Sequence, residues 1–346
     1  MDSRVSINPK HPGYPHWNEG TAQMTVHMPP NLVFSDPPEH TRRRRMLSRA
    51  FTTKRVAALR PAIQESTEEL LDSILSGPKP ADLVGALALP LPTLMICGLL
   101  GVPYEDHGIF QHWSTQAMGR YATAGTEALS RLMEYLTGLI EARLGQADEG
   151  GENVISDLIE LVRAGEITVP EAVIAAQTLL TAGHETTANM IALGILALLE
   201  HPDQLAVLRD TDDPKVVANA VQELLRYLSI VHNGQRRVAA EDIEIGDEVI
   251  RAGEGIIIEL TSANWDPKAF PEPERLDLRR RASEHHAFGF GIHQCIGQQL
   301  ARVELQVVFS TLFKRIPTLK LATPVDQIPF KHDRLAYGVY ELPVTW

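Results

Sequence analysis

A glycine-rich segment near the carboxyl end contains the residue with the most specific chemistry. Residues 288–302 have the sequence FGFGIHQCIGQQLAR and include Cys295, one of only two cysteines among 346 residues. A cysteine placed where a glycine-rich turn meets a helix lies close to unpaired N–H groups and the positive end of the helix dipole, which favour the thiolate. Gly289 and Gly291 allow a tight turn beneath the sulfur, and Gly297 leaves room for a flat ligand. The pattern predicts an anionic, reactive sulfur at Cys295.

A structural role is the alternative for each cysteine. Free cysteine is most often part of a buried core, and composition alone leaves that interpretation open for Cys295. Cys97 fits it well, because it lies in the apolar stretch LPTLMICGLLG, where Thr93 is the only polar neighbour within four positions. We therefore expect Cys97 to pack in the core and only Cys295 to be reactive.

A long apolar helix is predicted over residues 168–200. Thr168 and Glu171 have capping-box spacing at its start, and Pro170 fits the first turn. Between the two ends of this helix only Glu185 carries a formal charge, so the helix must be buried on nearly all sides. A buried carboxylate is unfavourable unless it is paired, hydrogen-bonded or functional, which makes Glu185 a candidate functional residue.

A membrane span is the competing interpretation of this helix. Eight polar side chains would then lie in hydrocarbon, which is unfavourable. They are Gln177, Thr178, Thr181, His184, Glu185, Thr186, Thr187 and Asn189. We therefore expect a helix buried within protein.

The remaining segments indicate a mainly α protein with a small β part (α+β). Segments such as LRPAIQESTEELLDSIL carry apolar residues at three- and four-residue spacing, which is typical of amphipathic helices. Strand signals are confined to residues 238–260, where glycines interrupt an alternating pattern, and to residues 335–346. No linker, repeat or low-complexity run divides the chain, so we expect a single domain over residues 1–346.

Charge and leader signals narrow the function classes. The net charge of −12 works against nucleic-acid binding. The one dense basic run, at residues 42–45, has no interleaved aromatics, so we expect a solvated helix face or a docking surface for an acidic partner. The first ten residues lack the basic start and apolar centre of a signal peptide, and two unpaired cysteines suit a reducing compartment. We expect a cytoplasmic protein without a membrane or nucleic-acid partner.

The cysteine segment resembles the haem-binding loop of the cytochrome P450 haem-thiolate monooxygenases, FGxGxHxCxGxxLAR. Nine positions match, namely Phe288, Gly289, Gly291, His293, Cys295, Gly297, Leu300, Ala301 and Arg302. The resemblance implies that Cys295 is the axial ligand of the iron in haem b (iron protoporphyrin IX) and that Phe288 is an aromatic shield beside it. The motif wording is similar to that of bacterial, especially actinobacterial, members of the family.

A second segment, AGHETT at residues 182–187, resembles the oxygen-activating part of the family's long central helix, where a helix irregularity, an acid and a threonine face the haem. Glu185 and Thr186 match the acid and the alcohol, which implies catalytic roles for both. A hydroxyl that holds water and is supplied by an acid can deliver the protons that oxygen activation needs. Gly183 beside the acid indicates a local distortion of the helix.

Glu223 and Arg226 are three residues apart on a predicted helix, a spacing that in isolation most often gives a surface ion pair. Followed by the PxPERLD element at residues 271–277, they resemble the family's buried Glu–Arg–Arg triad. The resemblance implies a structural triad of Glu223, Arg226 and Arg275.

The resemblance also implies cations for the two haem propionates. His40 and Arg44 lie in DPPEHTRRRR, which is similar to a family element, Arg237 precedes a predicted strand, and His293 lies two residues before Cys295. A zinc site is the competing interpretation, and its ligands would be Cys295, His293, His285 and His286. One cysteine is too few for most zinc sites, and a flat macrocycle explains the glycines better.

The resemblance covers nearly the whole chain except its start. Family members have a first helix and two sheet strands ahead of the segment that residues 8–34 resemble, and we expect these elements to be absent here. A late start or a fragment is our preferred hypothesis, and a reduced sheet is the alternative.

The implied function is a monooxygenase that inserts one oxygen atom of O₂ into a lipophilic organic substrate, such as a secondary metabolite or xenobiotic, by hydroxylation or epoxidation. The chain carries no flavin or nicotinamide fingerprint, so the resemblance implies a ferredoxin and its reductase as electron donors. We expect a monomer. A haem-thiolate peroxygenase or isomerase and an inactive haem-binding relic are the alternatives.

The resemblance also implies which residues line the substrate pocket. By analogy the lining comes from residues 11–33, 113–126, 178–185, 230–235 and 335–338. Leu179, Leu180 and Ala182 are expected near the oxygen site, and His232 and Asn233 are expected as polar anchors.

Overall fold

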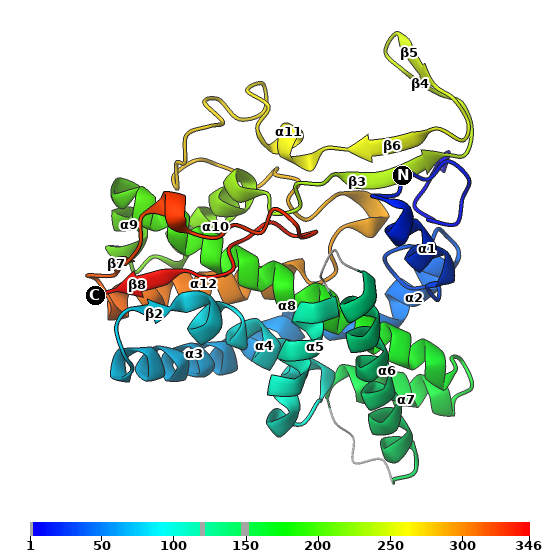
Figure 1. The fold of residues 1–346 in the computed structure, drawn as a ribbon, viewed down its shortest axis with the longest axis horizontal. Helices are drawn as coiled ribbons and strands as arrows, with labels where there is room; N and C mark the ends of the chain where they lie inside the picture. Colours follow the sequence, from blue (N-terminus) through cyan, green and yellow to red (C-terminus); the bar gives the residue numbers. More distant parts are fainter. Residues whose placement is uncertain (1–2, 118–121, 147–151) are drawn as a thin grey trace.

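The longest helix, α8 (Val169–Glu200), runs through the middle of the molecule (Figure 1). The structure is a computed structural model that describes residues 3–117, 122–146 and 152–346. The predicted capping box starts α8, because the Thr168 hydroxyl accepts from the Glu171 N–H at 3.4 Å and the Glu171 carboxylate accepts from the Thr168 N–H at 3.0 Å. The helix ends at Glu200, and His201 follows as its cap, just before the proline that opens the next helix. Its middle and carboxyl-terminal half are almost wholly buried, as expected from the sequence.

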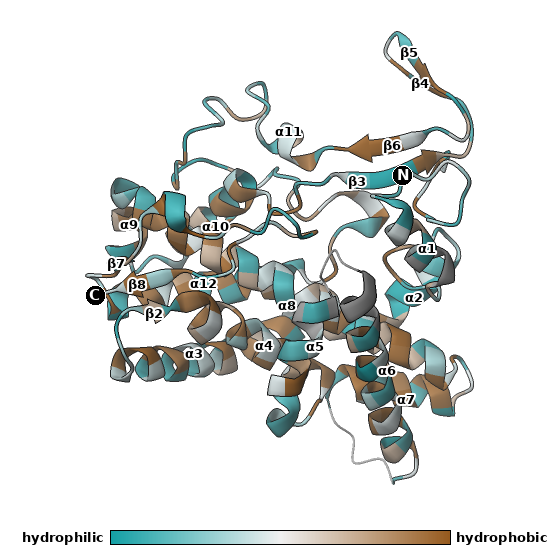
Figure 2. Cartoon of the chain, in the orientation of Figure 1, coloured by the Kyte–Doolittle hydropathy of each residue, from teal (hydrophilic) through white to brown (hydrophobic). Residues whose placement is uncertain are grey.

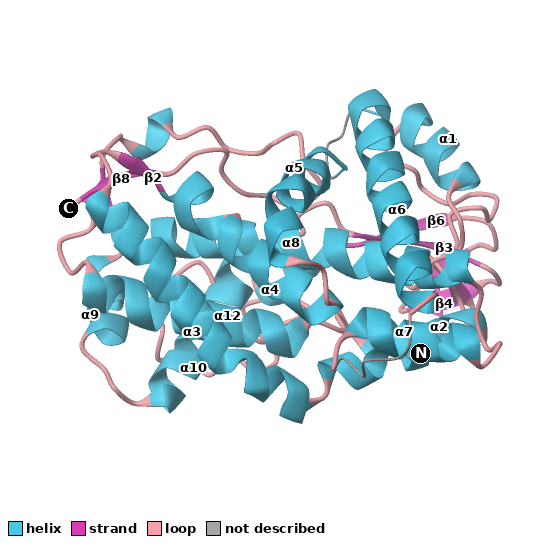
Figure 3. Ribbon diagram, turned by 90° about the horizontal axis from the view of Figure 1, so that it is seen from below, coloured by secondary structure: helices cyan, strands magenta, loops and turns pink. Residues whose placement is uncertain are grey.

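Helices surround α8 on several sides, and helices dominate the view in Figure 3. Those in contact with α8 are α4 (Pro90–Leu100), α5 (His107–Ala117), α6 (Ala122–Leu144), α7 (Val154–Arg163), α9 (Pro202–Arg209), α10 (Pro214–Leu228) and α12 (Gln298–Arg315). The others are α1 (Glu19–His27), α2 (Glu39–Ser48), α3 (Thr53–Ser76), which packs on α12, and the short α11 (Leu260–Asn264). Single turns of other helix types cover Arg49–Phe51, Val84–Ala88, Tyr104–Asp106, Gly291–His293 and Val325–Gln327.

The strands form small antiparallel sheets at opposite ends of the molecule (Figures 1 and 3). One has the order β1–β3–β6, another the order β2–β8–β7, and β4 pairs with β5 in a projecting hairpin. Their bounds are β1 (Val5–Ser6), β2 (Ala81–Asp82), β3 (Gln235–Ala239), β4 (Ile243–Ile245), β5 (Glu248–Ile250), β6 (Gly255–Ile258), β7 (Lys320–Leu321) and β8 (Pro343–Thr345). Val5 pairs with Ala239, and Gln235 pairs with Ile258. The mainly α fold with a small β part is confirmed.

One hydrophobic cluster extends from Leu32 to Val344 and takes in both sides of α8. Apolar and polar residues alternate along most helices in Figure 2. Helices α8 and α12 pack closely at Gly194, where an added Cβ would lie 2.4 Å from the Phe309 ring. A larger residue at this position would have to displace that ring from the core.

No single helix within the described residues combines the length and apolar character needed to cross a membrane. Helices α8 and α9 pass that test of length and composition only as a pair, and they meet at a bend of 113°.

Candidate active site

A cavity of about 760 Å³ lies between α8, the cysteine segment and the first turns of α12. Cys295, Phe288 and His293 line it from the segment, and Thr186 lines it from α8. Apolar side chains complete the lining, Leu179 and Met190 from α8 and Ile96, Val231 and Ile258 from other elements. The segment and the helix that sequence analysis singled out thus form two walls of one space.

The cysteine segment is shaped by its glycines. Gly289 and Gly291 have φ values of +71° and +74°, a left-handed backbone conformation that other residues adopt only with strain. A single helical turn, Gly291–His293, follows, and the Cys295 N–H donates to the Phe288 carbonyl at 2.9 Å. Helix α12 then begins at Gln298, immediately beyond the cysteine. The predicted glycine turn and helix start are both present.

The electrostatics of Cys295 combine opposing effects. Cys295 is exposed to the cavity, but the protein packed around the sulfur desolvates it and raises the pKa of its thiol above the ordinary value, whereas hydrogen bonds from the Gly297 and Gln298 N–H groups and the charges of Arg44 and Arg302 lower it. The helix start favours the thiolate as predicted, but in the protein alone burial outweighs it. A metal ion at the sulfur would reverse that balance, because a coordinating thiol is deprotonated.

Basic side chains gather beside the segment. Arg237 and His293 line the cavity, and the His40 ring lies 4.1 Å from the His293 ring, centroid to centroid. Arg44 interacts by charge with both histidines. The structure thus brings together the four residues predicted as propionate cations. Arg236 turns the other way, donating to the Pro15 carbonyl at 2.8 Å with its guanidinium 3.5 Å from the Trp17 ring centroid.

The α8 wall differs from expectation in two respects. The helix continues through Gly183 without a break, so the predicted distortion is wrong. Gly183 instead packs under Ile96, where an added Cβ would lie 3.1 Å from that side chain. Leu179 and Ala182 line the cavity as predicted, whereas Leu180 is fully buried in the core.

The acid and the alcohol of α8 face different ways. Thr186 lines the cavity and its hydroxyl donates to the Ala182 carbonyl at 2.8 Å. Glu185 is 1% exposed and is absent from the cavity lining within the described ranges. Its Oε1 lies 3.3 Å from the Nζ atom of Lys331. The expectation that both side chains face the haem is therefore wrong for Glu185.

The buried carboxylate of Glu223 has three basic or amide partners. Arg226 binds both of its oxygens at 2.8 Å, and the two side chains are fully buried. Arg280 donates to the same carboxylate at 3.1 Å, and so does the Asp277 N–H. Arg275 is the wrong third member. Its side chain is 58% exposed and pairs with Glu272 and Asp277, because the turn at residues 271–277 directs it to solvent.

One buried amide links this cluster to the cysteine segment. The Asn264 carbonyl accepts from Arg226 at 2.9 Å, and its side-chain oxygen accepts from the His286 N–H at 2.6 Å. The Asn264 amide also donates to the Ser229 hydroxyl at 2.7 Å. The Glu–Arg cluster is therefore linked through one residue, Asn264, to the chain just before the cysteine segment.

Three of the five predicted substrate-lining ranges reach the cavity, among them residues 178–185 through Leu179, Ala182 and Gly183. Val33 does so from residues 11–33, and Ile230, Val231 and Gln235 do so from residues 230–235. Trp113, Gln116 and residues 335–338 do not line it, and the side chains of residues 114, 115 and 117–126 lie outside the described part of the chain. His232 stacks on Tyr337, and the Asn233 amide donates to the Arg334 and Leu335 carbonyls at 3.3 Å. The two predicted polar anchors thus hold a loop.

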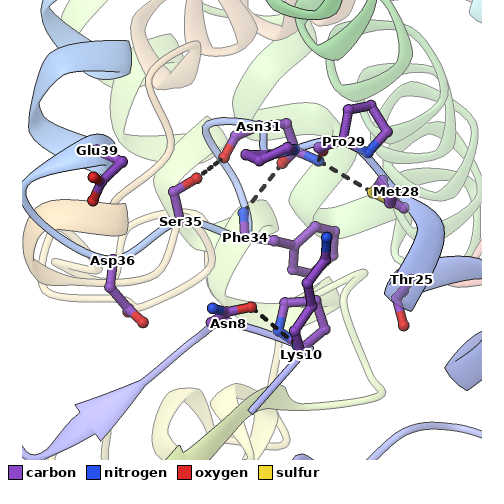
Figure 4. A pocket seen from close by; sticks show the side chains of 12 residues that line it. Asn8, Lys10, Thr25, Met28, Pro29, Asn31, Phe34, Ser35, Asp36 and Glu39 are labelled. Carbon is purple, nitrogen blue, oxygen red and sulfur yellow. Dashed lines mark hydrogen bonds between the residues drawn. The ribbon is translucent and has the colours of Figure 1, made fainter.

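A smaller pocket of about 230 Å³ lies between the amino-terminal strand and α2 (Figure 4). The Asn31 side chain accepts from the Val33 and Phe34 N–H groups, and Ser35 donates to the Asn31 carbonyl at 2.5 Å. Asp36 accepts from Ser6 and Ile7. These bonds fix the segment that separates the pocket from the cavity, and the two share no lining residue among the described ranges.

Comparison with known proteins identifies the family. A profile of the cytochrome P450 family matches residues 107–333. The protein named cytochrome P450 CYP105Q4 of Mycobacterium marinum is 60% identical over 349 residues, which cover 100% of this chain and 83% of its own. The chain is a cytochrome P450. As such it is a haem-dependent oxidoreductase of the monooxygenase class.

Solved P450 structures have the same fold. The crystal structure of GfsF, a cytochrome P450 of Streptomyces halstedii, has a TM-score of 0.94 at 54% identity. The match covers 100% of this chain and 86% of the GfsF chain. The structure of the mycinamicin VIII C21 methyl hydroxylase MycCI of Micromonospora griseorubida, bound to mycinamicin VIII, has a TM-score of 0.92 at 41% identity. The match covers 100% of this chain and 87% of MycCI. The P450 described here thus spans most of each relative.

Unpaired, buried ring nitrogens of two histidines show that the residues of this P450 fit a haem. Both ring nitrogens of His40 and the Nε2 atom of His293 are buried with no hydrogen-bond partner among the described residues. Burial, followed by the charges of His40 and Arg237, lowers the pKa of His293 to about 4. An acidic group here would satisfy these atoms and offset the positive charge. The donor set therefore suits propionates beside a thiolate-bound iron.

Three side chains at or near this site were missed by sequence analysis. Arg280 belongs to a run of three arginines at residues 279–281, which sequence alone does not resolve. Lys331 has no local signal, since its partner lies 146 positions away. Glu304 lines the cavity from α12 and is 2% exposed, and it could have been found as the one acidic residue of an apolar helix.

Proposed function

We propose that this P450 uses haem b, held by Cys295, to insert one oxygen atom of O₂ into a lipophilic organic substrate by hydroxylation or epoxidation. The observation that carries the proposal is that Cys295 and Thr186 line different walls of one cavity of about 760 Å³. When bound, the haem supplies the iron that activates oxygen, with the cysteine thiolate as an electron-rich ligand. His40, Arg44, Arg237 and His293 are the proposed propionate partners, and Phe288, Gly289 and Gly297 the proposed walls of the cofactor site.

The proposed proton donors are Thr186 and Glu185. Because the Thr186 hydroxyl donates to the Ala182 carbonyl, its lone pairs remain to accept from a water molecule in the cavity. Such a water, held beside the reacting oxygen, can pass on a proton. Glu185 is the adjacent acid that would return a proton to this water.

The substrate class follows from the cavity lining. Leu179, Met190, Val231 and Ile258 are apolar, and Gln235 is one of the few polar side chains beside the cofactor wall. Such a lining favours a lipophilic molecule of medium to large size. The relative bound to mycinamicin VIII has 41% sequence identity, which supports a secondary metabolite or a similar xenobiotic.

We further propose that electrons come from an acidic ferredoxin and its reductase. Arg44 on α2 interacts by charge with Cys295, which places the basic run of α2 near the sulfur, and Arg45 in the same run is exposed. Such a patch attracts an acidic partner despite the net charge of −12. We also propose that the protein is a monomer and that it is cytoplasmic. The two free cysteines support the cytoplasmic location, because disulfides are rare in a reducing compartment.

The reduced carbon monoxide complex tests the proposal. We expect the red-shifted Soret band of thiolate ligation in the purified protein and its loss in Cys295→Ala, with Cys97→Ala as a matched control that keeps it. Titration with mycinamicin VIII and a panel of lipophilic compounds should then shift the Soret band as water leaves the iron. An unshifted carbon monoxide band in well-folded protein would refute haem-thiolate chemistry.

A further inference from the structure

Asp36 joins the amino-terminal strand to the start of α2, and its side chain lines the smaller pocket (Figure 4). The Asp36 carboxylate accepts from the Ser6 hydroxyl and, at 3.0 Å, from the Ile7 N–H. Its backbone carbonyl accepts from the His40 N–H at 3.0 Å. Asp36 is therefore bonded to the β1 segment through its side chain and to the first turn of α2 through its main chain.

The strand that Asp36 binds lies beside the strand that carries Arg237. Ser6, whose hydroxyl donates to Asp36, pairs across the β1–β3 ladder with Val238, the residue after Arg237. Successive residues of a strand point to opposite faces. Val238 is fully buried, and Arg237 lines the cavity. The bond from Asp36 to β1 therefore fixes the backbone next to Arg237.

The main-chain bond of Asp36 acts on the other pair of proposed propionate cations. It joins the Asp36 carbonyl to the N–H four residues on, which is the bond pattern of an α-helix. His40 and Arg44 follow at the same four-residue spacing, and residues spaced in this way share one face of a helix. Asp36 therefore holds the start of the face of α2 that carries His40 and Arg44.

The negative charge of Asp36 is unfavourable beside a site for anionic propionates. Asp36 is close enough to interact by charge with His40, Arg237 and His293. Like charges repel, and a partly buried site screens them less than water does. An acid here needs a role that offsets this repulsion. Its bonds to β1 supply one, because a charged acceptor binds a hydroxyl and an N–H more strongly than a neutral one.

We propose that Asp36 is a positioning residue for the haem propionates, acting through Arg237 and His40. Its carboxylate clips β1, and with it β3, to the start of α2. The clip aligns the cation on β3 with the cations on α2, so that both elements can bind the propionates. The inference rests on the proposed function, since it takes the haem propionates as the ligands of this cluster.

The first test measures how tightly haem is held. Ferric, haem-loaded protein is mixed with excess apomyoglobin, and the transfer of haem is followed at the Soret band. Asp36→Ala removes both the clip and one negative charge. The change in charge alone would slow haem loss, because one repulsion of the propionates disappears, whereas loss of the clip speeds it. We expect haem loss about fivefold to tenfold faster than in wild type.

Two further variants separate the clip from the charge. Glu39→Ala is the matched control, at an exposed acid in the first turn of α2, and should lose haem no faster than wild type. Ser6→Ala keeps the charge of Asp36 but removes one bond of the clip, and should speed haem loss about twofold to threefold. It carries the test if Asp36→Ala cannot be isolated with haem. A rate at or below that of wild type in either clip variant would overturn the proposal.

The second test separates positioning from general stability. Arg237→Lys keeps the positive charge but loses the forked geometry of the guanidinium, and should speed haem loss when Asp36 is present. In the Asp36→Ala background Arg237 is already misaligned, so the same change should add much less. Residues that act independently give effects on the rate that multiply. Multiplying effects would overturn the proposal, and so would an Arg237→Lys variant that loses haem at the wild-type rate.

Resonance Raman spectra of freshly loaded protein report directly on the propionates. The propionate bending band should move to lower frequency in Asp36→Ala, as weaker hydrogen bonding predicts, and stay in place in Glu39→Ala. A band that stays in place in Asp36→Ala would contradict the positioning role. Failure of the proposed function is seen separately, because wild type would then lack the thiolate band of the carbon monoxide complex, while haem transfer and the propionate band would still report on Asp36.

Discussion

Replacing Arg280 with methionine removes the third member of the Glu223 cluster while retaining an unbranched apolar side chain. The Arg280 side chain is 11% exposed, and its Nε atom lies 3.1 Å from the fully buried Glu223 carboxylate. Its other nitrogens donate to the carbonyls of Pro271, Glu272 and Arg275. Glu223 keeps its bonds from Arg226 and the Asp277 N–H, so the loss should fall near the lower end of the range for breaking buried pairs, at about 3 kcal/mol of unfolding free energy.

The matched control is Arg275→Met, at the arginine that sequence analysis selected. Its side chain is 58% exposed and pairs only with Glu272 and Asp277, so the expected loss is about 0–1 kcal/mol. The assay is urea unfolding followed by far-ultraviolet circular dichroism, together with the haem content of each purified variant. Arg280→Met should unfold at clearly lower urea and carry less haem, whereas Arg275→Met should match wild type. Equal losses in the two variants, or a larger loss in Arg275→Met, would refute the assignment.

Two further predictions concern the cavity walls. Thr186→Ala should retain haem and substrate binding but release more of its electrons as hydrogen peroxide, and unchanged product per NADPH consumed would remove Thr186 from the proton path. Glu304→Gln tests a buried acid, because burial raises the pKa of Glu304 to about 8. Its stabilising contribution is present at low pH and is lost as the pH rises toward 8, so wild type should lose on the order of 4 kcal/mol relative to Glu304→Gln between about pH 5 and 9. Parallel pH profiles of unfolding free energy for the two proteins would contradict this.

The sequence was most informative where chemistry and geometry are local. The cysteine segment could be predicted because its glycines, its cysteine and the helix start lie within fifteen consecutive residues, 288–302. Helix α8 could be bounded because a capping box and a proline mark its ends. Helical periodicity and strand alternation likewise act over a few residues, so the mainly α fold with a small β part followed from them.

The errors arose where a contact joins distant segments. Residues 271–281 offer four arginines to Glu223, and only the path of the turn decides that Arg280 points inward and Arg275 outward. The sequence around Lys331 does not indicate that this lysine is buried, because its ammonium is buried through contact with Glu185 of the distant helix α8. The two-residue strands β1 and β2 are too short for an alternating pattern, and they exist because β3 and β8 offer them backbone partners.

Asn264 gives the haem segment an anchor that does not depend on haem. Its backbone carbonyl accepts from Arg226, and its side-chain amide bonds Ser229 and the His286 N–H, in one buried chain of hydrogen bonds made entirely of protein groups. The upstream end of the segment is thereby fixed by protein groups alone, ahead of the sulfur that we propose as the iron ligand. We therefore expect loss and recapture of the cofactor to be local events at one end of a tethered loop, which would let the polypeptide be reloaded without refolding as a whole.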